Sequence, residues 1–362
     1  MLSSRTILEV REHPQRRSME ERRALMAAPA FGRVFTDHMV TAKWNEAKGW
    51  HDAQVCPRAP FLIDPACSVL HYAQEIFEGL KAYRTTTGGV ALFRPEQNAR
   101  RFAASARRLA MPELPEELFL DAVKALVGID QDWIPGGDGS LYLRPFMFAS
   151  EAFLGVRPSA EYTFCVIACP VGAYFKGGGG SLKLWISEQH SRAAPGGTGA
   201  AKCGGNYAAS LLAQAEAIEN DCDQVVFLDA IEHQWIEELG GMNLFFVMAD
   251  QTIVTPQLSG TILAGITRDS IVTLARDCGL SVQERRYSLD EWRADAAQLR
   301  LVEAFACGTA AVVAGISEVR SRAGSIRIGN GELGALTRAL RDELVMLQRG
   351  ELPDRHGWTV NL

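Results

Sequence analysis

The chain has 362 residues, of which 47% are hydrophobic and 22% charged, and its formal net charge is −6. This length favours two domains, and the lack of a basic excess argues against a nucleic-acid-binding protein. Because no run of about 18 apolar residues occurs, the sequence predicts no membrane-spanning helix.

The cysteines and the N-terminal residues indicate the cellular compartment. The eight cysteines show neither CxxC spacing nor the rhythm of zinc ligands, so we predict reduced thiols and no bound metal. Acidic residues alternate with arginines near the N-terminus, whereas transit peptides avoid acids, and no apolar signal-peptide core is visible. Both observations predict a cytoplasmic protein.

The N-terminal half combines short strands with helices. Residues 1–60 show little periodicity and are expected to be irregular, with short helical pieces. From there to about Ala173, hydrophobic periodicity and turn signals predict further elements. The predicted strands are Val69–Tyr72, Gly79–Arg84, Val90–Arg94, Ser140–Ala149 and Tyr162–Cys169, and the predicted helices are Glu96–Leu109 and Phe119–Ile129.

Four consecutive glycines at 177–180 divide the sequence, because such a run is entropically costly in any regular element. We therefore predict an N-terminal domain at 1–175, a linker at 176–182 and a larger C-terminal domain at 183–362. Both domains mix strands and helices, which indicates an α/β or α+β fold. The elements predicted after the linker are a strand at Leu182–Ser187, a helix at Tyr207–Ile218, a meander of Gln224–Leu228, Gln234–Leu239, Asn243–Met248 and Thr252–Thr255, and helices at Thr267–Arg276 and Arg338–Gln348.

The segment Pro195–Tyr207 is the most unusual in the sequence, because glycines surround Lys202, one of only seven lysines. Three interpretations are open: a solvated lysine, a phosphate-binding loop, or a lysine that forms a Schiff base with a bulky cofactor. The spacing GxxxxGK[ST] is not met, since Cys203 follows the lysine. Glycines give the room that an imine-linked ring needs.

A pyridoxal phosphate cofactor would need an acid for its ring nitrogen and donors for its phosphate. Glu238 is a candidate acid, although taken alone it is more readily an exposed charge on a half-buried sheet. Arg101 lies on the inward face of its helix, where an arginine is unexpected, and Arg100, Arg107 and Arg108 are more readily surface charges. Candidate phosphate turns are Gly265–Arg268 and Cys307–Ala310.

Several motifs in one order resemble the branched-chain aminotransferases, a group of the fold-type IV pyridoxal-phosphate enzymes. They extend over roughly residues 30–320. The motifs are His71-Tyr72, Phe77–Lys81, Leu92–Pro95, Tyr142–Pro145, Leu154–Val156, Pro170–Phe175, Lys202–Tyr207, Glu237–Asn243 and Thr255–Arg268.

The resemblance implies a two-domain enzyme like the D-amino-acid aminotransferases, with pyridoxal 5′-phosphate between the domains and Lys202 as both cofactor anchor and proton carrier. Implied cofactor residues are Arg101, Lys202, Tyr207, Glu238, Ile266, Thr267 and Thr309. Implied substrate residues are Tyr72, Phe77, Tyr142, Arg144, Leu154, Val156, Tyr174, Thr309 and Ala310. Leu154 and Val156 would come from the partner subunit of a homodimer.

The implied reaction is amino transfer between leucine, isoleucine or valine and 2-oxoglutarate, because an apolar pocket discriminates weakly among aliphatic side chains. Two departures from the family stand out. Residues 311–314 lack the CxxC redox pair of mammalian members, and Gly241 replaces a threonine found in some relatives. D-amino-acid aminotransferases and aminodeoxychorismate lyases remain alternatives, as do a phosphate-binding module and an inactive scaffold.

Overall fold

The computed structural model describes residues 8–172 and 181–362, which divide into two compact units. The first unit comprises residues 8–172 with Ala201–Gly204 and Leu347–Leu362, and the second comprises the described residues 181–200 with Gly205–Met346. The predicted division assigned all of 183–362 to the C-terminal domain. It therefore differs from the structure at two segments, Ala201–Gly204 and Leu347–Leu362. Both segments make hydrogen bonds with the first unit, including Lys202 N to Ser105 Oγ and Thr359–Asn361 to a strand at Val90–Phe93.

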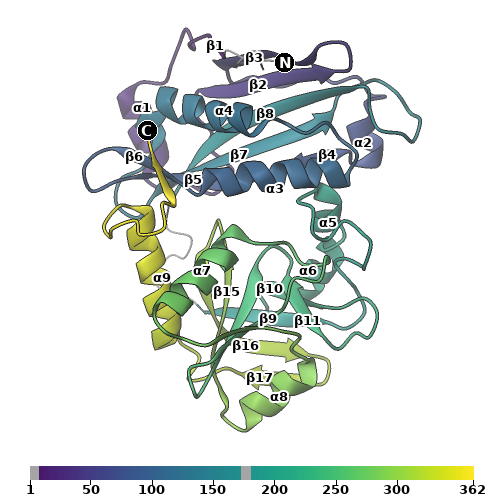
Figure 1. Cartoon of the computed structure of the whole chain (residues 1–362), viewed down its shortest axis with the longest axis vertical. Coiled ribbons are helices and arrows are strands. Elements are labelled where there is room, and N and C mark those ends of the chain that lie inside the picture. The colour runs from purple at the N-terminus through teal and green to yellow at the C-terminus, as the bar shows by residue number, and fades with distance from the viewer. Residues whose placement is uncertain (1–7, 173–180) are drawn as a thin grey trace. The chain divides into compact units, whose positions relative to one another are not determined.

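The first unit is a sheet covered on one face by helices (Figure 1). The strand order is β1-β3-β2-β8-β7-β5-β6-β18, with β4 beside β7. Its strands are β1 (Glu9–Val10), β2 (His38–Asn45), β3 (Gly49–Pro57), β4 (Glu75–Phe77), β5 (Leu80–Arg84), β6 (Val90–Phe93), β7 (Ser140–Ala149), β8 (Glu161–Val171) and β18 (Thr359–Asn361). Its helices are α1 (Met19–Met26), α2 (Ser68–Tyr72), α3 (Pro95–Arg108), α4 (Glu116–Ile129) and the 3-10 turn Gln131–Trp133.

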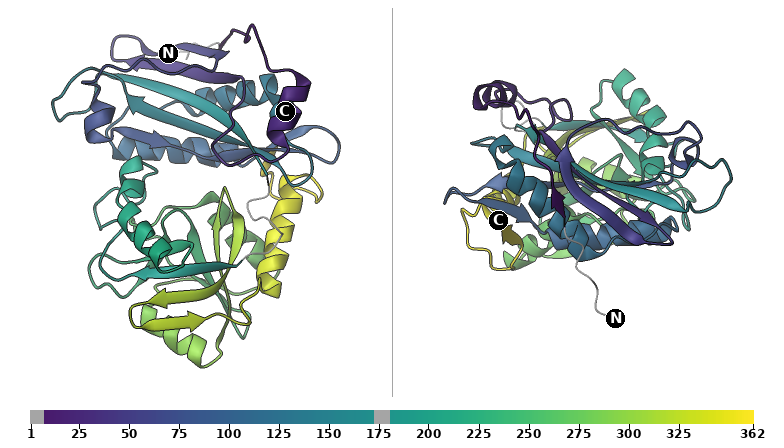
Figure 2. Two further views of the ribbon diagram at one scale, coloured as in Figure 1. Left: turned by 180° about the vertical axis from the view of Figure 1, so that it is seen from behind. Right: turned by 90° about the horizontal axis from the view of Figure 1, so that it is seen from above.

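Helices α3 and α4 lie side by side on the sheet of the first unit, as Figures 1 and 2 show. Pro95 begins α3, where its missing N–H costs nothing. Phe102 of α3 and Phe119 of α4 meet with their ring centroids 5.5 Å apart, and both contact Phe164 of β8. Through these aromatic contacts between helices and sheet, the inward face of α3 packs into the hydrophobic core of the first unit.

The second unit contains a closed ring of strands. The order is β11-β10-β9-β16-β15-β12-β13-β14, β17 extends it at β16, and β11 also pairs with β12. Closure leaves the ring strands without open edges. The strands are β9 (Leu182–Ser187), β10 (Gln224–Leu228), β11 (Ile236–Leu239), β12 (Asn243–Met248), β13 (Ile253–Thr255), β14 (Val282–Glu284), β15 (Leu301–Gly308), β16 (Val312–Ser321) and β17 (Gly324–Arg327). The helices are α5 (Gly204–Ala208), which begins at the last residue of the first unit, α6 (Leu211–Glu219), α7 (Ile266–Asp277), α8 (Leu289–Ala297) and α9 (Ala335–Gln348).

Three predicted elements were wrong. Val69–Tyr72 lies in helix α2 rather than a strand, because an apolar run this short has no distinguishing period. The helix predicted at Tyr207–Ile218 is interrupted, since the hydroxyl of Ser210 donates to the carbonyl of Tyr207 between α5 and α6. Residues 1–60 are not irregular throughout, because β2 and β3 form an antiparallel pair within the sheet.

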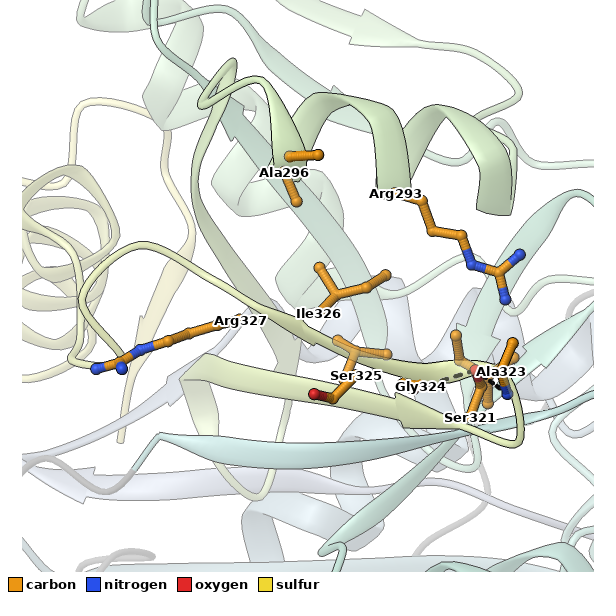
Figure 3. A pocket seen from close by; sticks show the side chains of 11 residues that line it. Arg293, Ala296, Ser321, Ala323, Gly324, Ser325, Ile326 and Arg327 are labelled. Atoms are coloured by element: carbon orange, nitrogen blue, oxygen red, sulfur yellow. Dashed lines mark hydrogen bonds between the residues drawn. The ribbon is translucent and has the colours of Figure 1, made fainter.

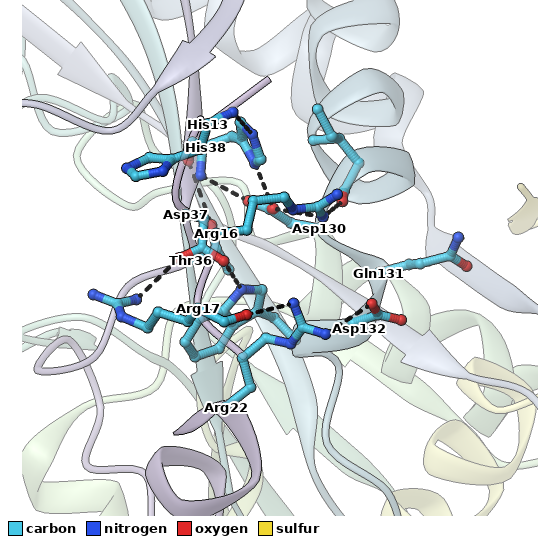
Figure 4. Close-up of polar contacts among 12 residues, drawn as sticks. His13, Arg16, Arg17, Arg22, Thr36, Asp37, His38, Asp130, Gln131 and Asp132 are labelled. Atoms are coloured by element: carbon cyan, nitrogen blue, oxygen red, sulfur yellow. Dashed lines mark hydrogen bonds and ion pairs between the residues drawn. The ribbon is translucent and has the colours of Figure 1, made fainter. Parts of the chain in front are cut away.

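Hydrogen bonds and ion pairs connect the N-terminal segment to the rest of the first unit (Figure 4). His38 and Asp130 are fully buried, and His38 Nδ1 lies 2.7 Å from Asp130 Oδ1. Because His38 Nε2 accepts the backbone N–H of His13 at 2.8 Å, the ring proton resides on Nδ1 and is donated to Asp130. Arg17 adds an ion pair to Asp37 at 3.5 Å.

Among the described residues, no helix is long and apolar enough to cross a membrane.

Candidate active site

Lys202 belongs to the first unit and lies over the ring of Phe77 on β4. Its Nζ is 4.7 Å from the centroid of that ring. Burial, together with the charge of Arg101, lowers the pKa of Lys202 to about 8, and Glu78 opposes both effects. The interpretation of Lys202 as a solvated loop lysine is therefore wrong, and its amine is much closer to deprotonation at neutral pH than an ordinary lysine is.

Arg101 of α3 is bound by a carboxylate that the sequence did not single out. Its Nε and Nη2 donate to Glu78 at 2.7 and 2.8 Å, and Asn98 Nδ2 donates to the same carboxylate at 2.7 Å. Glu78 is fully buried, and although burial alone would raise its pKa, Arg101 brings the pKa below its ordinary value. A buried anion thus fixes the guanidinium in a bidentate geometry. The available signal was an acid between apolar residues in the motif Phe77–Lys81.

Arg144 and Tyr142 of β7 form a cationic and aromatic cluster with Phe77. Arg144 Nη2 donates to Tyr142 Oη at 3.1 Å, and the guanidinium carbon is 4.7 Å from the Phe77 ring centroid. The Nε of Arg144 is buried and has no acceptor among the described residues. Phe31 contacts Tyr142 edge to face with the centroids 5.0 Å apart, and no pattern in its sequence neighbourhood indicated this position.

The remaining predicted substrate residues of the first unit lie on its surface. Tyr72 Oη donates to the carbonyl of Leu154, which fastens the 152–157 loop to α2. Tyr72, Leu154 and Val156 are 38%, 57% and 85% exposed. Tyr174 lies outside the described residues, as does the glycine run at 177–180.

Glu238 of β11 is held in the second unit by three donors. Arg192 Nη1 lies 2.8 Å from Oε1, the backbone N–H of Leu263 donates to the same oxygen at 3.0 Å, and Asn243 Nδ2 donates to Oε2 at 3.2 Å. The residue is 2% exposed, so the interpretation as an exposed charge is wrong. Donors of this number and charge keep a buried carboxylate ionised. Arg192 was not predicted, because a lone arginine in an irregular segment carries no pattern.

Other predicted cofactor residues surround Asn243 in the second unit. Asn243 also donates to the carbonyl of Leu263 at 3.0 Å, and a Cβ on Gly265 would overlap its side-chain oxygen. Helix α7 begins directly afterwards, so the N–H groups of Ile266 and Thr267 belong to its first turn, where anions bind well.

Tyr207, Thr309 and Ala310 are the remaining predicted residues of the second unit. A Cβ on Gly241 would lie 3.7 Å from Cε1 of Tyr207, so the ring stands beside the turn between β11 and β12. Thr309 and Ala310 form a turn directly after β15, whose Cys307 is paired with Asn243 of β12. The second unit thus brings an ionised acid, a phenol and two turns of small residues to neighbouring strand ends.

A cavity of about 330 Å³ lies elsewhere in the second unit, between α8 and the β16–β17 hairpin (Figure 3). Arg293 extends from α8 toward the hairpin tip at Ser321–Gly324 in this view. None of the predicted site residues lines it.

Comparison with known proteins gives one consistent result. The family model described as "Amino-transferase class IV" matches residues 75–319. A probable branched-chain-amino-acid aminotransferase of Streptomyces coelicolor is 58% identical over 347 residues, which cover 95% of this chain and 96% of the relative. The chain belongs to the class IV aminotransferases. Its resemblance to the branched-chain-amino-acid aminotransferases, which was expected from the motifs, is confirmed.

Further matches extend this assignment within the family. The branched-chain-amino-acid aminotransferase of Mycolicibacterium smegmatis is 54% identical and covers 94% of both chains. A crystal structure of the branched-chain amino acid aminotransferase of Thermobaculum terrenum in its PLP-form matches with a TM-score of 0.74 and 26% identity, covering 90% of this chain and 98% of that one. The predicted fold class of mixed strands and helices is therefore confirmed as that of the class IV aminotransferases.

Proposed function

We propose that this class IV aminotransferase transfers amino groups between branched-chain L-amino acids (leucine, isoleucine, valine) and 2-oxoglutarate, with pyridoxal 5′-phosphate bound covalently to Lys202. One observation carries the assignment of the anchor. Lys202 is the lysine whose amine lies over Phe77 and whose pKa burial lowers to about 8. An amine of this kind becomes nucleophilic near neutral pH.

The residues of both units suit this cofactor. Arg101 offers a fixed cation for phosphate, and the first turn of α7 offers the N–H groups of Ile266 and Thr267. Glu238 is buried and ionised, as the partner of a protonated ring nitrogen must be. Tyr207 would donate to the ring hydroxyl, and Thr309 would complete the phosphate site.

When bound, the cofactor supplies an electron sink that makes the substrate α-proton acidic. The Lys202 amine, once the incoming substrate amine had released it from the cofactor, would hold and move that proton beside the substrate α-carbon. A general base works best when its pKa lies near the operating pH, and the lowered pKa of Lys202 meets this condition. Burial contributes most to the lowered pKa of Lys202, the charge of Arg101 lowers it further, and Glu78 opposes both effects.

The substrate pocket must accept an aliphatic side chain and, in the second half-reaction, the distal carboxylate of 2-oxoglutarate. We assign that carboxylate to Arg144 with Tyr142, because the buried Nε of Arg144 has no acceptor among the described residues. Phe77 would line the part of the pocket that accepts the aliphatic side chain of the substrate. Tyr72 and the Thr309-Ala310 turn would bind the α-carboxylate.

We also propose that the enzyme is a cytoplasmic homodimer in which Leu154 and Val156 complete the partner's pocket. Both side chains are more than half exposed, and Leu62 and Leu70 of the same unit are 104% and 59% exposed. Contact with a partner subunit would cover these apolar side chains. Sedimentation of the purified protein measures the assembly directly, and a monomer that retains full activity would contradict the shared pocket.

A coupled assay with 2-oxoglutarate against L-leucine, L-isoleucine, L-valine and D-alanine tests the function. Activity with the three L-substrates supports the proposal, and activity confined to D-alanine would move the chain to the D-amino-acid aminotransferases. The purified protein should be yellow and should bleach with borohydride. Lys202→Ala should abolish turnover and the near-visible absorption, whereas an unchanged spectrum would exclude Lys202 as the anchor.

A further inference from the structure

The short segment Ala201–Gly204 is held to the rest of the first unit by three hydrogen bonds of its backbone. The backbone N–H of Phe77 donates to the carbonyl of Lys202 at 3.0 Å. Lys202 N donates to Ser105 Oγ at 3.0 Å, and Gly204 N donates to a carboxylate oxygen of Glu75. Two side chains, Ser105 and Glu75, therefore bind the main chain at Lys202 itself and two residues beyond it.

Ser105 belongs to the inward face of α3, and it is 1% exposed. Asn98, Arg101 and Ser105 are spaced by three and four residues, so they share that face. Asn98 and Arg101 bind Glu78, while Ser105 binds the backbone of Lys202. One helix face thus fixes both the arginine assigned to the phosphate and the lysine assigned to the cofactor.

Glu75 and Phe77 are two residues apart on β4, so they share one face of the strand. Phe77 lies under the amine of Lys202, and Glu75 accepts the N–H of Gly204. A Cβ on Gly204 would overlap the Glu75 carboxylate, so only glycine permits this approach. Burial raises the pKa of Glu75 above its ordinary value, although the Gly204 N–H and the charge of Arg144 act in the opposite direction.

We propose that Ser105 and Glu75 are positioning residues that keep the Lys202 amine over Phe77. The inference rests on the proposed function of Lys202. A glycine-rich segment loses much conformational freedom when it is ordered, and hydrogen bonds on both sides of the lysine offset that loss. Without them, the amine samples positions from which it cannot reach the cofactor, although the cofactor still binds through the phosphate and ring contacts.

The experiment separates covalent capture from non-covalent binding. Apoenzyme is mixed with pyridoxal phosphate, the linkage is fixed with borohydride at timed intervals, and the Lys202 adduct is quantified by mass spectrometry. In parallel, the Kd of pyridoxamine phosphate is measured, because this compound cannot form the linkage. The variants are Ser105→Ala, Glu75→Leu, and Glu75→Gln, which loses the charge but keeps an acceptor oxygen.

We expect Ser105→Ala and Glu75→Leu each to slow capture about tenfold, as the loss of one hydrogen bond predicts. The Kd of pyridoxamine phosphate should stay within twofold, and Glu75→Gln should capture within threefold of wild type. Equal losses in capture and Kd, or no loss in either, would overturn the proposal. If Ser105→Ala fails to fold, the Glu75→Leu and Glu75→Gln pair decides alone. Failure of the wild type to capture pyridoxal phosphate would instead refute the proposed function.

Discussion

Arg192 and Glu238 form an ion pair of 2.8 Å in the second unit, and their side chains are only 2% and 3% exposed. Arg192 also donates to the carbonyl of Thr261 at 3.1 Å. A buried pair of this kind contributes little net stability, but the loss of one partner leaves an uncompensated charge. Arg192 therefore supplies the counter-charge of the acid that we assign to the cofactor ring.

Replacing Arg192 with methionine should destabilise the apoprotein by about 3–5 kcal/mol, because Glu238 then remains buried without its counter-charge. Pyridoxal phosphate binding should also weaken, because Glu238 loses the charged donor that holds it in place. Urea unfolding and a cofactor titration measure the two effects. Adding Glu238→Gln to this variant should recover part of the lost stability, since it removes the unpaired charge. No recovery in the double variant would contradict the electrostatic account.

The pKa of Lys202 predicts a pH-dependent difference in stability between wild type and Lys202→Met. The folded pKa is about 8 and the ordinary value is 10.5, so the unfolded chain binds more protons between these values. The lysine's contribution to stability is present above the ordinary pKa and is lost as the pH falls through about 8. Lys202→Met should therefore be more stable than wild-type apoprotein at pH 7, by about 2 kcal/mol after allowance for partial exposure, with no difference above pH 10.5.

Urea unfolding of the two apoproteins at pH 7 and pH 10.5 measures that difference. Lys48→Met at an exposed position is the matched control, and its stability relative to wild type should not change with pH. A Lys202→Met difference that is constant across the range would show that the amine is not desolvated.

Two glycines of the second unit should respond differently to alanine. A Cβ at Gly241 would find only Tyr207 Cε1, at 3.7 Å, so Gly241→Ala should stay within about 0.5 kcal/mol of wild type. A Cβ at Gly265 would displace the Asn243 amide that supports Glu238, so Gly265→Ala should lose about 1–3 kcal/mol and bind pyridoxal phosphate less tightly. Thermal unfolding and cofactor titration compare the two, and equal effects would contradict the assigned role of Asn243.

Arg144 should affect the two half-reactions unequally. Arg144→Gln removes a charged donor from the 2-oxoglutarate carboxylate, which should lower kcat/KM for that substrate roughly 10–100-fold. The half-reaction with L-leucine should change less than about threefold, because no distal carboxylate is present. Stopped-flow measurement of each half-reaction tests this separation. Equal losses of rate in both half-reactions would show that Arg144 maintains the structure of the site and does not recognise the carboxylate.

Elements with strong local patterns were predictable from the sequence. Ser140–Ala149 and Leu182–Ser187 coincide with β7 and β9, because continuous apolar runs between turn signals indicate buried strands. The pair β2 and β3 was not predicted, although residues 40–45 alternate apolar and polar side chains as a half-buried strand does. The expectation of irregular structure for residues 1–60 missed this period of two.

The candidate site divides in the same way. Lys202 was predicted because glycines surround it in the sequence. Arg101 was predicted because it lies on the inward face of its helix. The residues that bind Arg101, Lys202 and Glu238, namely Glu78, Ser105 and Arg192, were not predicted, because long-range packing brings them into contact: Ser105 is 97 residues from Lys202. No local period records such a contact. The roles of the site residues in catalysis stay predictions.

The C-terminal strand β18 has a consequence for the synthesis of the protein. Thr359 of β18 pairs with Phe93 of β6, and Leu362 N donates to the carbonyl of Val90 at 2.9 Å. At about 5–20 residues per second, the ribosome needs roughly 10–50 s to add the intervening chain. Throughout that time β6 is an open edge on the half of the protein made first. Deleting residues 359–362 would make that temporary edge permanent.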